Sequence, residues 1–490
     1  MEQIRIGPVE MALVLLLAIG LGIAMVLGKS GLLVGAVAGT TLLITSFLST
    51  PLSLYLLVYS MLLGPEFMFG GEFSGAATSG KATKVGHGMT LRLDDFLLVV
   101  VGLIWLVKSA VHKEEAPFKY TPLNGPIFLY VAACAVATVI GVLVGRVRPL
   151  PGFFFNLKYF EYFFLYFMVI NVCKTKKMAM GLINASLITC FLVSVIAIGQ
   201  IPSGERASAP FEGEEGEPNT LGGYLVFMGC IITGLLLTPD STPKRWPYIT
   251  TLLLGLLALL ATLSRTSFLA AIVVLMVVIL KTSYKRPLLF SLVLLVMVAS
   301  PWWIPQAVKE RVFFTFTQSP KEVGQIRVGG LRVDTSTSER LRSWQQTADT
   351  LKESPLFGAG VTGSRYFMDA MVPRIITETG LVGLATFLLL MWAIFRTGWH
   401  CYRDAKTPYQ QGITLGFLLG FLALLVHSVG SNTFIIVRIM EPFWLYAALI
   451  VKMQQLAEVE GEEPEAQAEA AEAASVSLQP GFGFGHGRRL

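Results

Sequence analysis

Arg265 is the residue whose type and place in the sequence point most directly to chemistry. It interrupts the apolar run 248–280, which is too long for one untilted membrane helix. A guanidinium group is costly in such a run and usually faces a polar cavity or a charged partner. Its planar donors can bind a phosphate through two parallel hydrogen bonds. The pattern therefore predicts an anion site at a membrane boundary, with a snorkelling side chain or a structural ion pair as the alternative.

A polar stretch at residues 305–374 carries a second set of charged groups. It contains ten basic and seven acidic residues, which gives a net charge of +3. This balance favours an anion-binding surface just outside the membrane. For most of the charges, a solvated surface of paired side chains is the simpler interpretation. The residues of this stretch that enter the predicted site are Arg340, Arg342, Trp344, Asp369 and Arg374.

Helix and turn signals inside that stretch predict how those residues are positioned. Ser336 and Glu339 have the spacing of a capping box, so a helix is expected to begin there. Apolar residues then recur every three or four positions, which is typical of an amphipathic helix with one apolar stripe. Pro355 and a group of glycines end the helix in a tight loop. The stripe consists of Leu341, Trp344, Ala348 and Leu351, and the glycines are Gly358, Gly360 and Gly363.

The composition of the whole chain places these segments in a membrane protein. Of its 490 residues, 54% are hydrophobic and 14% are charged, and the mean hydropathy is +0.65. Repeated apolar stretches of this kind predict an all-α polytopic membrane protein with about fourteen transmembrane helices. Their approximate positions are 10–27, 31–48, 51–68, 95–111, 125–145, 157–173, 180–200, 219–238, two spans within 248–280, 287–304, 375–396, 411–430 and 434–453.

Four clusters of basic residues near the span ends predict the orientation, because the span count puts all four on one side. By the positive-inside rule that side is the cytoplasm, and both termini are expected there too. The predicted division is a transmembrane bundle at 1–304, a periplasmic loop at 305–374, transmembrane helices at 375–454 and a disordered cytoplasmic tail at 455–490. The clusters are Lys174 with Lys176 and Lys177, Lys244 with Arg245, Lys281 with Lys285 and Arg286, and Arg396 with Arg403 and Lys406.

Several other polar residues are expected to be structural. Asp94 and Asp95 would point apart on a helix, which favours a role at the helix N-terminus over a shared metal ion. His87 and His427 are lone histidines, and His427 falls inside a late predicted span. Glu378 opens the span at 375–396, where two nearby glycines fit close helix packing. The five cysteines, which fall in or beside spans, are expected to be small buried residues.

The sequence offers no motif for a metal, a nucleotide or a nucleic acid. It contains no phosphate-binding glycine loop followed by Lys, no paired-cysteine motif and no zinc-protease motif. No basic surface with interleaved aromatic residues points to nucleic acid. We therefore expect neither a metal nor a cofactor, and the energy for any reaction must come from an activated substrate or a gradient.

Three motifs occur in order between residues 200 and 400. The first is E-P-N-T-L-G-G-Y-L at 217–225, and the second is T-L-S-R-T-S at 262–267. The third begins at S-E-R, with Trp344 four residues after Arg340, continues as S-P-L-F-G-A-G at 354–360 and ends in E-T-G-L-V-G-L-A-T-F at 378–387. In this order and on this hydropathy, the sequence resembles the O-antigen ligase and polysaccharide polymerase family of bacterial membrane proteins.

The resemblance implies a fold like that of type C glycosyltransferases, a multispan helical bundle with a long helical periplasmic loop over a lipid-facing cavity. It matches Arg265 and Arg340 to the arginines that hold a lipid-linked diphosphate in that family. Arg342 is a substitute for Arg340, and Arg374 is a further candidate. Two arginines at a diphosphate leaving group would stabilise the charge that develops on it. Trp344 and Glu378 are expected to support these residues.

The resemblance also implies a general base, and here the sequence departs from the ligases of the family. Those ligases carry a His-Asn pair shortly before the residue that corresponds to Glu378, whereas residues 367–371 contain no histidine. Asp369 occupies the corresponding place. A carboxylate there would remove the proton of an acceptor hydroxyl if its pKa suits. A carboxylate paired with Arg365 or Arg374 is the alternative.

Together these expectations describe an inverting, metal-independent glycosyltransferase of the bacterial inner membrane. It would transfer a glycan from undecaprenyl diphosphate to an acceptor sugar at the periplasmic face. The missing histidine favours a polysaccharide polymerase over an O-antigen ligase that transfers to lipid A core. A transporter or flippase is the alternative from another class, because many spans and an intramembrane arginine fit it too. The expected partners are the lipid-linked oligosaccharide, the bilayer and, as candidates, a chain-length regulator and a flippase.

Overall fold

The computed structural model of the chain describes most residues between 49 and 477, and the described part is built from α-helices. Strands form only two short antiparallel hairpins there, β1 (Glu66–Phe69) with β2 (Met89–Arg92) and β3 (Arg327–Val328) with β4 (Leu331–Arg332). The described residues are 49–69, 89–111, 119–204, 206–212, 216–281, 327–328, 331–332, 335–364 and 368–477.

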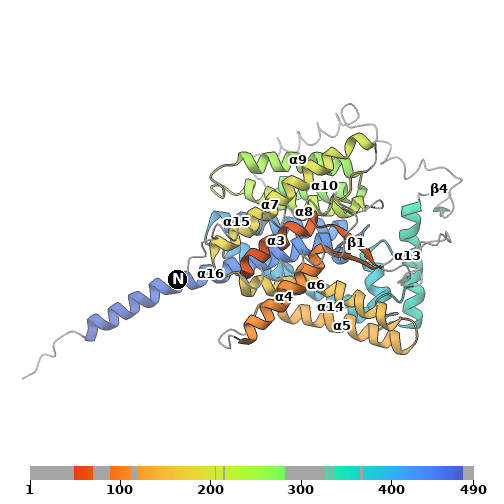
Figure 1. Cartoon of the computed structure of the whole chain (residues 1–490), viewed down its shortest axis with the longest axis horizontal. Helices are drawn as coiled ribbons and strands as arrows, with labels where there is room; N and C mark the ends of the chain where they lie inside the picture. Colours follow the sequence, from red (N-terminus) through yellow and green to blue (C-terminus); the bar gives the residue numbers. More distant parts are fainter. Residues whose placement is uncertain are drawn as a thin grey trace, which may run out of the picture.

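The helices lie side by side in a bundle, apart from α13, which stands at one end of it (Figure 1). Apolar runs fold into helices in a bilayer because a helix satisfies all its own backbone hydrogen bonds. The helices are α3 (Thr50–Leu63), α4 (Leu93–Val111), α5 (Asn124–Leu143), α6 (Pro149–Val172), α7 (Lys176–Gly199), α8 (Pro218–Leu237), α9 (Trp246–Thr262), α10 (Arg265–Lys281), α13 (Thr335–Glu353), α14 (Met371–Arg403), α15 (Pro408–His427) and α16 (Val437–Ser477).

Six of the described helices are long and apolar enough to cross a membrane, namely α5, α6, α7, α8, α14 and α15. Helices α3, α9 and α10 are apolar but shorter. Each span predicted within the described residues overlaps a helix, including the pair on either side of Arg265, but the predicted span 51–68 is too long, because α3 ends at Leu63 and β1 follows. The predicted spans 10–27, 31–48 and 287–304 lie outside the described residues, so the count of about fourteen stays a prediction.

Helix α8 lies at the centre of the bundle and is the most buried of the six candidate spans. It packs closely on α15, because a side chain at Gly234 would overlap the backbone of Gly416. Small residues at such a contact let two membrane helices approach. On another face of α8, Phe227 packs its ring against the rings of Phe443 and Tyr446 from α16. Helix α8 is therefore packed directly against both α15 and α16.

Several connections between helices meet at one end of the bundle, which we call the α13 end. Arg146, between α5 and α6, donates to Ser354 just after α13, at 2.6 Å. The loop after α7 bonds the end of α9 through Ala207 N and Ala261 O, at 3.0 Å. The start of α14 bonds the end of α15 through Met371 N and the carbonyl oxygen of the residue after His427, at 3.2 Å. The predicted site residues of 335–378 thus lie beside the Arg265 break.

At the other end, α16 continues beyond the bundle as a projecting helix (Figure 1). The sequence predicts a disordered tail from residue 455, whereas the helix runs through Ser477. The composition explains the difference, because residues 464–475 are mostly alanine and glutamate, which have high helix propensity. Residues 478–490 lie outside the described part.

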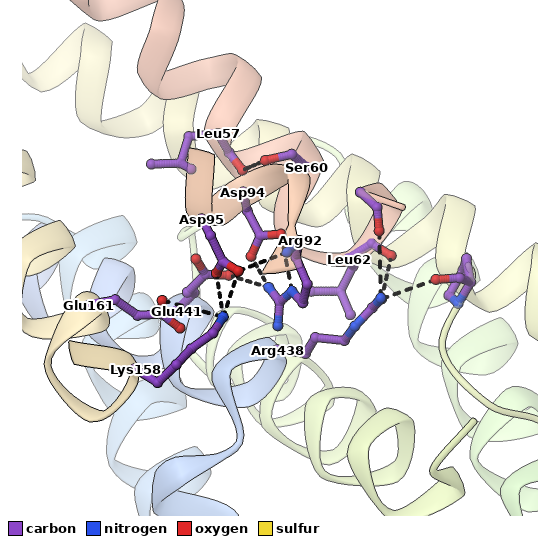
Figure 2. Close-up of polar contacts among 12 residues, drawn as sticks. Leu57, Ser60, Leu62, Arg92, Asp94, Asp95, Lys158, Glu161, Arg438 and Glu441 are labelled. Atoms are coloured by element: carbon purple, nitrogen blue, oxygen red, sulfur yellow. Dashed lines mark hydrogen bonds and ion pairs between the residues drawn. The ribbon is translucent and has the colours of Figure 1, made fainter. Parts of the chain in front are cut away.

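A buried network of charged side chains ties α4, α6 and α16 together (Figure 2). Arg92 donates to Asp94 and also to Glu441, at 3.0 Å, and Lys158 donates to Asp95 at 2.6 Å. Each of the two adjacent aspartates thus has its own basic partner. The expectation that they do not share a metal ion fits this arrangement. Removing one partner of such a pair would destabilise the protein, because it leaves a lone buried charge.

Candidate active site

Backbone hydrogen bonds join the two halves of the third motif. Ala359 N and Gly360 N donate to the carbonyl oxygens of Thr377 and Glu378, at 2.8 and 2.9 Å. In the other direction, the amides of residues 381 and 382 donate to the carbonyl oxygens of residues 355 and 356, at 2.9 and 3.1 Å. The loop after α13 is therefore fixed to the first turns of α14. This pairing explains why S-P-L-F-G-A-G and E-T-G-L occur together.

The pairing depends on a kink in α14 at Gly380. This residue has φ 67° and ψ −162°, a backbone conformation that is essentially restricted to glycine. A Cβ there would overlap the carbonyl oxygen of Leu356 and lie 2.6 Å from Phe357 N. The sequence predicted close packing at this glycine, and the structure shows that packing as a backbone contact at a break in the helix. The kink separates a short outer turn, which carries Glu378, from the long membrane helix.

We expect Gly380→Ala to lower the free energy of unfolding by about 1–3 kcal/mol, because the new Cβ forces a strained backbone conformation. Thermal unfolding of the purified protein in detergent would measure the change. Gly255→Ala in α9 is the matched control. Its Cβ would lie 3.7 Å from Ser194 Oγ, an ordinary van der Waals contact, and would have no closer neighbour. That variant should unfold at the wild-type temperature or slightly above it. Equal unfolding temperatures for both variants would contradict the proposed role of the kink.

Arg340 and Asp369 lie close together at the α13 end. Arg340 Nη2 is 3.9 Å from Asp369 Oδ2 and donates to the carbonyl oxygen of Gly430 at 2.7 Å. Its Nε is buried and has no hydrogen-bond partner among the described residues. The side chains of Arg340 and Asp369 remain 24% and 17% exposed, so a ligand can reach them. Arg340 thus has an unused hydrogen-bond donor and lies beside the accessible carboxylate of Asp369.

The environment of Asp369 makes its proton available near neutral pH. Burial raises the pKa of this carboxyl to about 7, and the negative charges of Glu217 and Glu339 push it in the same direction. The positive charges of Arg340 and Arg374 act in the opposite direction, but burial has the larger effect. A carboxylate with such a pKa is suited to accept a proton from a hydroxyl and release it again.

The break between α9 and α10 forms another wall of the site. Helix α9 ends at Thr262, and Leu263 has φ 50° and ψ 32°, so the chain turns sharply before α10 begins at Arg265. Arg206 closes the end of α9 by donating to Thr262 O at 3.0 Å and to Leu263 O at 3.4 Å. Arg206 had no signal in the sequence, because it lies in a predicted loop outside the three motifs. Arg265 itself is partly exposed at the first position of α10.

Gly430 brings the break and the loop together. A Cβ at Gly430 would lie 3.0 Å from Arg340 Cζ and still closer to Cγ2 of Thr266, the residue after Arg265. The start of α8 joins the same place, because Ser264 Oγ donates to Asn219 Oδ1 at 2.8 Å. The N-termini of α8, α10 and α14 thus meet around Arg340 and Asp369. Helix N-termini carry partial positive charge and free N–H groups, which favour an anion.

Arg374 and Glu378 form a separate ion pair near the start of α14. Arg374 Nε donates to Glu378 Oε1 at 3.1 Å, and the hydroxyl of Tyr159 donates to Glu378 Oε2 at 3.0 Å. Glu378 is only 4% exposed. Arg374 was predicted to bind the diphosphate, but in this structure its ion-pair partner is Glu378. Tyr159 had no signal in the sequence, since it lies in an apolar span far from the motifs.

The face of α13 that is buried differs from the predicted one. Trp344 is 50% exposed, and Arg342 is exposed too, whereas Ser343 and Thr347 are buried. Thr347 Oγ1 donates to the carbonyl oxygen of Pro373 at 3.2 Å and lies 3.0 Å from the hydroxyl of Thr377. The predicted helix is present, but its apolar stripe is not the buried face. Small hydroxyl side chains let α13 approach the start of α14 and satisfy its backbone, which larger apolar side chains cannot do.

Two further expectations concern metals and cysteines. Among the described residues, no group of three or more His, Cys, Asp or Glu side chains is arranged to hold a metal ion. All five cysteines are buried and unpaired, as predicted.

Much of this end of the bundle falls in a segment that matches a known protein family. Residues 250–388 match the model of the O-antigen ligase family. This segment contains the α9–α10 break, all of α13, Asp369 and the kink in α14. A comparison with curated proteins finds no match. Residues 250–388 of this chain therefore form a domain similar to the O-antigen ligase family.

Proposed function

We propose that this chain is a polysaccharide polymerase that transfers a glycan from undecaprenyl diphosphate to the hydroxyl of an acceptor sugar. Arg340 and Arg265 bind the diphosphate, and Asp369 accepts the proton of the attacking hydroxyl. Arg340 and the helix N-termini stabilise the charge that develops on the departing diphosphate, so the reaction requires no metal. Direct attack of the hydroxyl on the anomeric carbon inverts the configuration there. The reaction takes place at the periplasmic face of the inner membrane, with both termini in the cytoplasm.

The observation that carries this proposal is the meeting of Arg340 and Asp369 at the N-termini of three helices. A donor for an anion and a carboxylate with a pKa of about 7 lie 3.9 Å apart, and both remain accessible. A glycosyl transfer from a lipid diphosphate needs this pair of groups, one for the leaving group and one for the nucleophile. The match to the O-antigen ligase family supports the same reaction class.

An O-antigen ligase is the second candidate. The family match favours a ligase or a polymerase equally. The preference for a polymerase comes from residues 367–371, where Asp369 stands in place of the histidine of the ligases. A chain-length regulator and a flippase are the proposed partners of a polymerase.

The test is a transfer assay with purified protein, a lipid diphosphate-linked oligosaccharide, no nucleotide and excess EDTA. A ladder of longer lipid-linked glycans would support a metal-independent polymerase. A single transfer onto lipid A core would identify a ligase instead. If no acceptor receives the glycan, but intact lipid-linked substrate crosses a vesicle membrane, the enzyme proposal is wrong and a flippase remains.

We expect Arg265→Ala to raise KM for the lipid-linked donor about tenfold, with a smaller effect on kcat. The reason is that Arg265 is partly exposed at the helix start and would contact the diphosphate equally in the ground state and the transition state. Initial rates at varied donor concentration would measure the effect. Arg265→Lys should recover part of it, because it keeps the charge but not the planar fork. An unchanged KM for Arg265→Ala would remove Arg265 from the diphosphate site.

A further inference from the structure

A chain of hydrogen bonds runs through buried side chains from the end of α15 to the start of α8. Thr433 Oγ1 lies 2.8 Å from His427 Nδ1, and His427 Nε2 lies 3.1 Å from Ser267 Oγ. Ser267 Oγ donates to Ser264 Oγ at 2.8 Å, and Ser264 Oγ donates to Asn219 Oδ1 at 2.8 Å. The first four of these side chains are fully buried. This series of hydrogen bonds joins the peptide segment that carries Arg265 to the segment that binds Arg340.

The directions of these bonds fix the state of His427. A serine hydroxyl has a single hydrogen, and Ser267 gives its hydrogen to Ser264. Ser267 Oγ must therefore accept from His427, so Nε2 of the imidazole carries a hydrogen. Nδ1 then accepts from Thr433, whose other acceptor, the carbonyl oxygen of Ser431, is more distant at 3.5 Å.

A neutral His427 also fits the nearby charge. Arg340 donates to the carbonyl oxygen of Gly430, whose amide in turn donates to the carbonyl oxygen of His427. A buried imidazolium next to that guanidinium would be unfavourable, because two like charges would share a site with little water. His427 is therefore a neutral imidazole with its hydrogen on Nε2.

Asn219, the last residue in this series of hydrogen bonds, is the one that can reach a ligand. Asn219 uses Oδ1 as an acceptor for Ser264, so its amide nitrogen faces away from that serine. The nitrogen makes no hydrogen bond within the described residues, and the side chain is partly exposed beside the N-terminus of α8. Glu217, at the same N-terminus, is close enough to influence Asp369. Asn219 thus has two N–H donors available at the start of α8, the helix whose N-terminus lies near Asp369.

We propose that Asn219 donates a hydrogen bond to the diphosphate of the lipid-linked substrate, and that His427 is the positioning residue that turns its amide nitrogen outward. The inference rests on the proposed function for the identity of the ligand. With the opposite order of hydrogen bonds, Asn219 would present an oxygen atom, which repels an anion. The direction of these hydrogen bonds therefore decides whether the start of α8 attracts a diphosphate.

The tautomer of His427 provides a test that needs no activity. Protein labelled with ¹⁵N-histidine would be examined by NMR, and the signal of His427 would be identified by its loss in His427→Gln. We expect a neutral ring with the hydrogen on Nε2 and an accepting Nδ1. A hydrogen on Nδ1, or a doubly protonated ring, would overturn the relay even if the protein is an active transferase.

Binding of sugar-free undecaprenyl diphosphate provides the second test. We expect Asn219→Ala to weaken binding about tenfold and Asn219→Asp to weaken it more, because a carboxylate repels the anion. Gln345→Ala, an exposed amide on α13, is the control and should bind like the wild type. Wild-type binding to Asn219→Ala would overturn the inference, whereas wild-type binding of the lipid without transfer to any acceptor would overturn only the proposed function.

A cycle of variants separates positioning from general stability. If His427 acts through Asn219, then His427→Ala and Asn219→Ala should each weaken binding, and the double variant should be no weaker than Asn219→Ala. His427→Gln should recover binding, since its amide can donate to Ser267 in place of Nε2. Additive losses, or no recovery with Gln, would contradict a positioning role for His427.

Discussion

Arg340→Ala is expected to lower kcat/KM for glycan transfer by about 10²–10³-fold, the usual loss when one preorganised donor to a developing negative charge is removed. The structure gives the physical reason. The guanidinium is held by Gly430 and lies beside Asp369, while its buried Nε has no partner among the described residues. The side chain is still 24% exposed, so the guanidinium can reach an oxygen of the departing diphosphate. The loss should fall mainly on kcat, because the leaving group gains charge only as the bond breaks.

Two variants on the same helix serve as comparisons for Arg340→Ala. Lys352→Ala removes an exposed cation that is paired with Asp349, and its transfer rate should stay within about twofold of the wild type. Arg342→Ala tests the alternative arginine, which is exposed two residues away. Each variant is first checked for its unfolding temperature. A large loss with Arg342→Ala and none with Arg340→Ala would show that the wrong arginine was assigned.

Within the described residues, the sequence was sufficient to predict the membrane helices and the break at Arg265. A membrane helix depends on its own run of apolar residues, so hydropathy alone locates it. The break is local as well, because Ser264 and Arg265 interrupt an apolar run, and Leu263 turns the chain there. The glycine positions in the third motif were equally visible. What hydropathy could not show was that Gly380 kinks α14 to receive the loop at residues 355–360.

The helix α13 was predicted from its periodicity, but its buried face was not, because a partner helix decides burial there. Trp344 belongs to the apolar stripe, yet it is half exposed, and Thr347 is buried instead. Thr347 contacts Pro373 and Thr377, which follow in the chain only after a loop. Apolar periodicity measures the helix alone. It gives the wrong face where polar groups at the start of a neighbouring helix need hydrogen bonds.

The contacts that the sequence did not show are those between residues far apart in the chain. His427 stood alone in an apolar span, and its contact with Ser267 crosses 160 positions of the chain. Tyr159 reaches Glu378 across 219 positions. Neither residue has a local pattern that distinguishes it from a core residue. Asn219 did belong to a motif, but only its bond to Ser264 shows which atom of its amide is turned outward.

Asp369→Asn is expected to lower kcat by about 10²–10⁴-fold, the range for loss of a general base. The amide keeps the size of the side chain but cannot accept the proton of the acceptor hydroxyl. Asp349→Asn is the matched control, because that carboxylate is exposed on α13 and 73% accessible. If Asp369 only paired with Arg340, its substitution would raise KM for the lipid-linked donor and leave kcat nearly unchanged.

The pH dependence of wild-type transfer gives the sharper test of Asp369. Because burial raises the pKa of this carboxyl to about 7, the group is largely protonated at lower pH and ionised at higher pH. Only the ionised form can accept a proton, so kcat/KM should rise with pH and level off above about 7. Glu217→Gln removes a negative charge that raises this pKa, so the rise should move to lower pH. A profile that does not move in Glu217→Gln, or a rise that persists in Asp369→Asn, would place the base elsewhere.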